Sequence, residues 1–76
     1  LDVRIFQLNR KVDVSGVSGT GIVACGVDFG EYTVLYWIPE MTRLKVAGLG
    51  VYHALEEVDS IHGHDGKTVI EILSPR

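Results

Sequence analysis

The spacing of hydrophobic residues changes once along the chain. Across residues 3–38, apolar positions form short runs rich in β-branched and aromatic side chains, which is typical of β-strands. Across residues 54–62 the spacing lengthens, because Leu55, Val58 and Ile61 recur at every third position. The pattern therefore predicts a chain that is mainly β, with one short helix or 3₁₀ turn whose apolar stripe lies on the core.

Five strands are expected. They cover Val3–Asn9, Thr20–Phe29, Tyr32–Ile38, Leu44–His53 and Lys67–Leu73, and the short helical turn lies before the last of them. Gly48 and Gly50 are expected to mark a bulge or kink in the fourth strand. This order resembles that of SH3-like folds in outline, so we expect a small five-stranded, partly open SH3-like barrel. A chain of 76 residues has room for a single domain, residues 1–76.

The second and third strands are predicted to form a hairpin around Gly30 and Glu31, since glycine at the first position of a two-residue loop suits a type II′ turn. Pro39 is expected to end this hairpin, because proline donates no hydrogen bond to a sheet. The register pairs Phe29 with Tyr32, Val27 with Val34, Cys25 with Tyr36 and Val23 with Ile38. All of these residues are apolar or aromatic, so their face is expected to be the core face.

The opposite face of the hairpin is expected to be a partner surface. It runs from a polar pair, Asp28 and Thr33, at the turn to an apolar pair, Ala24 and Trp37, at the base. Leu35 and Trp37 stand there over small residues. Two interpretations of Trp37 stay open at this point. It is either a core aromatic residue or an anchor that contacts a partner together with Leu35 and Ala24.

Composition and charge narrow the function classes. Hydrophobic residues make up 46% of the chain, which suits a folded domain. The formal net charge is −3 and the 7 lysines and arginines are scattered. Nucleic-acid binding is therefore disfavoured, because it depends on neutralising phosphates. Cys25 is the single cysteine, which excludes an internal disulfide and favours a reducing, cytoplasmic location. No apolar run is long enough to span a bilayer.

A Ser/Gly-rich stretch, Asp13–Gly21, precedes the second strand. A P-loop would need a lysine after its last glycine and a helix behind it, and neither follows here. A backbone nest can still hold an anion without a helix. One interpretation is therefore a small-ligand or anion site, and the other is a turn-rich connector whose hydroxyls cap its own backbone. The candidate residues of such a site are Arg10, Lys11, Ser15, Ser18 and Thr20.

The turn His62–Gly66 contains two imidazoles and a carboxylate. Zinc needs three or four ligands, but His53 is the only other histidine and Cys25 is expected on the core face. We therefore expect no metal and no cofactor, and His62 and His64 are candidates for backbone or partner contacts. No nucleophile, base and orienting group are brought together by their spacing, so no catalytic residue is expected.

Three stretches resemble a known family. They read VSGVSGTGIVACGVDF at residues 14–29, VLYW at residues 34–37 and LEEVDSIHGHDGKTVIEI at residues 55–72. This pattern is similar to that of a family of short hypothetical proteins from actinobacteria, related genomes and phages, which share an S-G-x-S-G-T-G loop and an I-H-G-H-x-G turn. The chain departs from the pattern between Pro39 and Gly50. The resemblance implies no activity, and it marks the Ser/Gly loop, Trp37 and the histidine turn as defining features.

Together these features favour a non-enzymatic binding or interaction module whose partner the sequence does not identify. A chain this short gains limited stability from its own core, which favours a homodimer, and the resemblance implies an association with phages. An alternative is a small-ligand or anion-binding domain that uses the Ser/Gly loop. A second alternative is a small nucleic-acid-binding barrel, which the acidic pI of about 5.4 disfavours.

Overall fold

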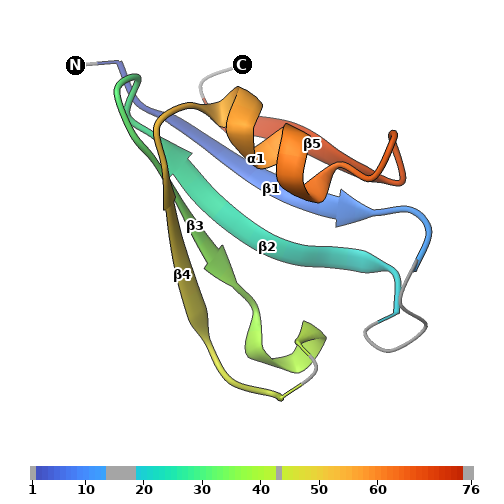
Figure 1. The fold of residues 1–76 in the computed structure, drawn as a ribbon. Coiled ribbons are helices and arrows are strands. Elements are labelled where there is room, and N and C mark those ends of the chain that lie inside the picture. Colours follow the sequence, from blue (N-terminus) through green and yellow to red (C-terminus); the bar gives the residue numbers. More distant parts are fainter. Residues whose placement is uncertain (1, 14–18, 43, 75–76) are drawn as a thin grey trace.

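The computed structural model describes residues 2–13, 19–42 and 44–74, and a single antiparallel sheet forms its framework (Figure 1). The strands are β1 (Arg4–Arg10), β2 (Gly21–Asp28), β3 (Thr33–Trp37), β4 (Gly48–Tyr52) and β5 (Thr68–Ser74). A 3₁₀ turn, η1 (Pro39–Met41), follows β3, and one helix, α1 (Leu55–His62), precedes β5. The prediction of a mainly β fold with five strands and one helical segment before the last strand is confirmed.

The strand order is β4-β3-β2-β1-β5, so β4 and β5 are the two edges and the sheet is not closed. The first four strands follow one another as a meander, and the chain then returns through α1 to place β5 beside β1. The partly open arrangement agrees with the prediction, and the likeness to SH3-like folds stays a prediction.

The hairpin of β2 and β3 has the predicted register throughout, from Ala24 opposite Trp37 to Asp28 opposite Thr33. At its turn the N–H of Phe29 donates to the carbonyl of Tyr32 at 2.8 Å. Gly30 has a φ of +95°, which the first position of a type II′ turn requires and which side chains disfavour. The strand ends before Pro39, as expected.

Helix α1 links the two edges of the sheet. It contacts both β4 and β5, although these strands lie at opposite ends of the strand order. The twisted sheet therefore curves around the helix, which lies against one of its faces (Figure 1). Val58 is fully buried and Leu55 packs against the same core, but Ile61 is 57% exposed. The predicted stripe is thus wrong at Ile61, because His62, four residues after Val58, takes the inward position.

The face of the sheet that α1 covers, called the covered face below, is not the one predicted to be the core. The core consists of Phe6, Leu8, Val23, Ala24, Leu35 and Val58. Ala24 and Leu35 are fully buried, whereas Cys25 is only partly buried and Tyr36 is 39% exposed. The predicted core face is therefore wrong at Cys25 and Tyr36, although Val23 is buried as expected, and Ala24 and Leu35 cannot line an exposed partner surface. The physical reason is that α1 packs on the Leu35 side of the sheet.

Glycines on the covered face make room for aromatic rings. A Cβ atom built on Gly26 would lie 2.6 Å from Cζ of Phe6, so the Phe6 ring lies directly over Gly26. Likewise, a Cβ atom built on Gly50 would lie 2.8 Å from Cε1 of Tyr52. Both glycines pair with Leu35, one from each side. These glycines therefore do not leave the covered face empty, because aromatic side chains pack over them.

The position of the bulge also differs from the prediction. β3 and β4 pair without a register shift, so Gly48 and Gly50 mark no bulge. The β1–β2 ladder instead shifts between Leu8 and Asn9, which leaves Val23 as an extra residue between two paired positions. An extra residue of this kind turns the strand locally, and Val23 is buried in the core beside Ala24.

An ion pair closes the covered face near the hairpin turn. Arg4 donates from Nε at 3.1 Å and from Nη2 at 2.5 Å to Oδ2 of Asp28, and Oδ1 accepts the N–H of Gly30 at 2.9 Å. The hydrogen bond from Gly30, and next that from Arg4, lower the pKa of Asp28. A carboxyl whose pKa is lower in the folded state stabilises the fold above the ordinary aspartate range and loses that contribution as the pH falls.

The close approach of the Phe6 ring can be tested at Gly26. A Cβ there would overlap the carbonyl oxygen of Val34 as well as the ring. We expect Gly26→Ala to lower the free energy of unfolding by about 2 kcal/mol, as overpacking does. Gly48→Ala is the matched control, because its Cβ would meet only Trp37 Cδ1 at 3.8 Å. Chemical denaturation measures both, and equal stability of the two variants would contradict the packing described.

Candidate functional site

The uncovered face of the sheet carries an apolar surface, called the open patch below. Side chains alternate between the two faces of a strand, so the neighbours of the buried residues lie here. The open patch consists of Ile5, Cys25, Val27, Phe29, Val34, Tyr36, Leu49 and Val51, none of which is fully buried. Contiguous exposed apolar surfaces of this kind mark interaction sites on small proteins.

The strand register places the open patch in rows. Val51, Val34, Val27 and Ile5 are successive cross-strand partners, so four branched side chains stand side by side across four strands. The next row begins with Leu49, Tyr36 and Cys25 and ends in polar residues on β1 and β5. The apolar surface is therefore continuous over β4, β3 and β2 and reaches β1 in the first row, whereas the second row becomes polar at β1.

The open patch is not flat. A hollow of about 380 Å³ lies over β1, β2 and β3, and it is lined by Ile5, Cys25, Gly26, Val27, Phe29, Val34 and Tyr36. Leu49 and Val51 stand on the neighbouring edge strand and are 73% and 67% exposed. The same face thus presents a hollow beside a pair of projecting aliphatic side chains.

Polar side chains border the open patch where β1 meets β5. Glu71 accepts a hydrogen bond from Gln7 Nε2 at 2.7 Å and one from Asn9 Nδ2 at 3.1 Å, and Lys11 Nζ lies 4.0 Å from its Oε2. The bonds from Gln7 and then Asn9 lower the pKa of Glu71. An apolar centre with a polar border is the usual anatomy of a protein interface.

Trp37 lies on the covered face, in a cluster with Tyr52 and His62. The Trp37 and His62 rings meet edge to face with their centroids 4.8 Å apart, and the Tyr52 hydroxyl lies 2.9 Å from Nε2 of His62. Trp37 is half-buried and packs against the core cluster. Of the two interpretations of Trp37, the structure thus favours the core residue, and it separates Trp37 from the open patch.

The histidine turn is a local structure. His64, Asp65 and Gly66 all have positive φ, at 50°, 56° and 88°. The reversal therefore uses three residues rather than the predicted Asp65 and Gly66 alone. Among the described residues, no three His, Cys, Asp or Glu side chains come together as a metal site would require. The absence of a metal stays a prediction, which elemental analysis of the purified protein checks.

The candidate anion site is described only in part. Ser15 and Ser18 lie outside the described residues. Arg10 ends β1, Lys11 donates its main-chain N–H to the carbonyl of Lys67 at 2.7 Å, and Thr20 is exposed. The N–H of Gly19 donates to Oδ2 of Asp13 at 2.6 Å, which is the type of contact expected of a turn-rich connector.

The open patch was not found by sequence reasoning. Leu49 and Val51 alternate with Gly48 and Gly50, and this period-two pattern indicates a regular strand with both aliphatic side chains on one face. The prediction of a bulge or kink at these glycines hides that alternation. The alternation places both aliphatic side chains on one face and both glycines on the other.

The protein is thus a small antiparallel sheet with one face covered by α1 and one apolar face left open. A family model described as Acb5 phage protein matches residues 3–74, and the chain belongs to this family of phage proteins. No curated protein and no solved structure matches the chain. The phage part of the predicted resemblance is thereby confirmed, while its actinobacterial part stays a prediction. Within the part of the chain that the structure describes, no helix has the length and apolar character needed to cross a membrane.

The packing of His62 against Trp37 predicts that the stability of the fold depends on pH. Burial, and then the positive charges of His64 and Arg10, lower the pKa of His62. Folding therefore favours neutral His62, so stability is full above about pH 6.5, the ordinary histidine pKa, and falls as the pH drops below it. We expect this slope to disappear in His62→Gln, which stays uncharged and can still bond the Tyr52 hydroxyl.

His53→Gln is the control, because His53 is exposed and contacts Tyr32 rather than this cluster. Denaturation followed by Trp37 fluorescence between about pH 8 and pH 5 measures all three proteins. A His62→Gln variant that keeps the wild-type slope would contradict the role assigned to His62.

Proposed function

We propose that this phage protein is a non-enzymatic interaction module that pairs with a second copy of itself through the open patch. The observation that carries the proposal is the row Val51, Val34, Val27 and Ile5 on the face opposite α1, in which the two outer residues are exposed and the two inner ones are half-buried. Such a surface offers apolar contact area, and burying it in a dimer is favourable at about 25 cal/mol per Å².

The size of the face supports a second copy as the partner. The two larger extents of the molecule are 38 and 25 Å. Their product, on the order of 900 Å², is an upper bound for the area of the open face, and stable protein pairs bury about 800 Å² on each partner, so a second copy would have to engage most of the face. A domain of this length also buries a smaller share of its surface than a larger domain does, so a second core between two sheets adds to its stability.

The shape of the open patch supports a two-fold arrangement. In a two-fold dimer the same surface meets itself, so every projection must find its hollow on the partner. Leu49 and Val51 project from β4, and the hollow lined by Cys25, Val27 and Val34 begins on the neighbouring strand β3 and extends over β2 and β1 of the same face. A two-fold axis near β3 would bring the projection of each copy to the hollow of the other, with the two sheets packed face to face.

The cellular setting is also part of the proposal. Cys25 is a free thiol and lies within the open patch. An accessible thiol persists in a reducing compartment and is at risk of oxidation elsewhere. These features support the cytoplasmic location that the sequence predicts.

The dimer can be tested by a single charge on the open patch. We expect Val51→Lys to weaken self-association at least about tenfold, because two ammonium groups would be buried in each dimer. The fold should be unchanged, since Val51 is 67% exposed in the monomer. Sedimentation equilibrium over about a hundred-fold range of concentration measures the association, and circular dichroism checks the fold.

Val46→Lys is the matched control. Val46 is 59% exposed but precedes β4, outside the open patch. It should therefore associate like the wild type. A wild-type protein that sediments as a monomer at every concentration would refute the proposal, and so would equal weakening by both lysines.

A further inference from the structure

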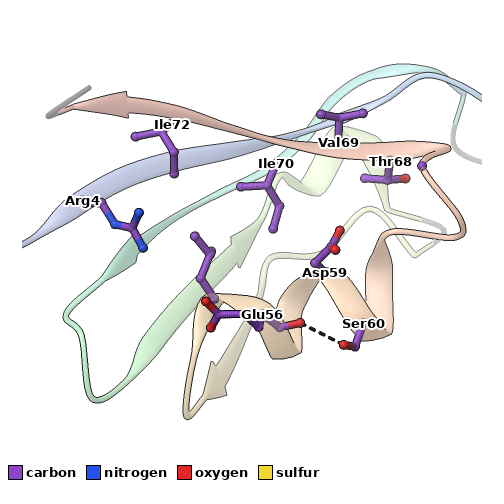
Figure 2. Close-up of a pocket in the computed structure, with 10 residues that line it drawn as sticks. Arg4, Glu56, Asp59, Ser60, Thr68, Val69, Ile70 and Ile72 are labelled. Carbon is purple, nitrogen blue, oxygen red and sulfur yellow. Dashed lines mark hydrogen bonds between the residues drawn. The ribbon is translucent and has the colours of Figure 1, made fainter.

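A groove of about 570 Å³ lies between α1 and β5, on the covered side of the sheet and away from the open patch (Figure 2). Ile70 and Ile72 of β5 line it on one side, and α1 lines it on the other with Leu55, Glu56 and Asp59. This volume lies in the range of natural binding sites. The groove has no part in the proposed dimer.

The groove runs along the main chain of an edge strand. Val69 borders it, although the alternation of side chains directs Val69 to the opposite face, where Figure 2 shows it. Val69 therefore contributes its backbone. β5 pairs with β1 on one side and ends the strand order on the other. Where β5 begins, the N–H of Thr68 donates to the carbonyl of Gly63 at 2.9 Å, so the turn after α1 takes up that end of the outer edge. Among the described residues, no strand takes up the peptide groups further along β5, and such an edge is a template for another strand.

The α1 wall carries unbalanced negative charge. Neither the Glu56 nor the Asp59 carboxylate has an ion-pair partner among the described residues. Arg4 lies at one end of the groove, but its guanidinium is held by Asp28. A ligand that fits this wall is therefore cationic, and one that also fits the floor has an aliphatic stem.

An unsatisfied polar group lies at the end of the groove where β5 begins. Thr68 is 3% exposed, and its Oγ1 atom has no hydrogen-bond partner in the part of the chain described. Buried hydroxyls are nearly always bonded. A peptide that binds along the rest of the groove ends beside Thr68 and can offer this hydroxyl a polar partner.

We propose that β5 and α1 bind an extended peptide of a partner protein, which adds to the edge of β5 as a sixth strand. Main-chain hydrogen bonds to β5 hold it, and its groove-facing residues are lysine or arginine. Their aliphatic stems lie on Ile70 and Ile72, and their charged ends reach Glu56 and Asp59. Strand addition beside a helix is a general mode of peptide recognition, in which the backbone gives affinity and alternate side chains give specificity.

The test uses the fluorescein-labelled peptide Thr-Lys-Thr-Lys-Thr-Lys-Thr, which matches the 7 residues of β5 in length. Fluorescence anisotropy should show saturable binding, and the same peptide with glutamates for lysines should not bind. The double variant Glu56→Gln/Asp59→Asn should bind about tenfold more weakly. Glu57→Gln removes a charge from the same helix outside the groove and keeps an acceptor for the N–H of His53, so it should bind like the wild type.

Strand addition is separated from simple charge attraction by a peptide with N-methyl groups at alternate residues. This peptide keeps the charges but cannot complete the ladder, and it should lose at least about tenfold in affinity. Equal binding of the methylated peptide, equal binding by the double variant, or no binding of the lysine peptide at about 1 mM would each overturn the proposal. In Val51→Lys, which should not pair through the open patch, protection of the β5 amides that rises with protein concentration alone would also overturn it, because a second copy would then occupy the edge.

Discussion

One helix of 8 residues provides the second layer for a sheet of five strands. A sheet with two apolar faces needs two covers, and α1 can supply only one. The rest of the described structure follows from having one helix to cover two apolar faces. The sheet curves so that its two edges reach the same helix, the covered face becomes the core, and the uncovered face stays apolar and open.

Packing on the covered face depends on small residues opposite large ones. Gly26 and Gly50 leave space for the rings of Phe6 and Tyr52, and Leu35 lies between them without exposure. Dense packing of this kind allows a single helix to exclude water from the sheet. The open patch has the reverse pattern, with branched side chains in adjacent rows and no layer over them among the described residues.

Local structure could be predicted from the sequence because it depends on neighbours in the chain. The hairpin register, the turn at Gly30 and the helical segment all follow from alternation and turn chemistry over a few residues. The choice of the core face could not be predicted in this way. Cys25 and Ala24 are both small and apolar, and only the side on which α1 packs decides which of them is buried.

Which residues form the candidate site also depends on the side of the sheet on which α1 packs. The sequence predicts a partner surface at Leu35 and Ala24, which lie in the core. It predicts a distorted strand at Leu49 and Val51, which project from the open patch. Trp37, the most conspicuous side chain in the sequence, contacts His62 within the fold. Aromatic residues are common both in cores and at interfaces, so residue type alone did not distinguish the two.

The central claim is that the open patch fits a second copy of itself. Leu49→Ser removes a projection but keeps the hollow, and Cys25→Phe fills the hollow but keeps both projections. Each variant alone should be mainly monomeric at a concentration at which the wild type is a dimer. When the two are mixed in equal amounts, one intact projection meets one intact hollow, and sedimentation should show a mixed dimer. A mixture that sediments as the two variants do separately would contradict the account.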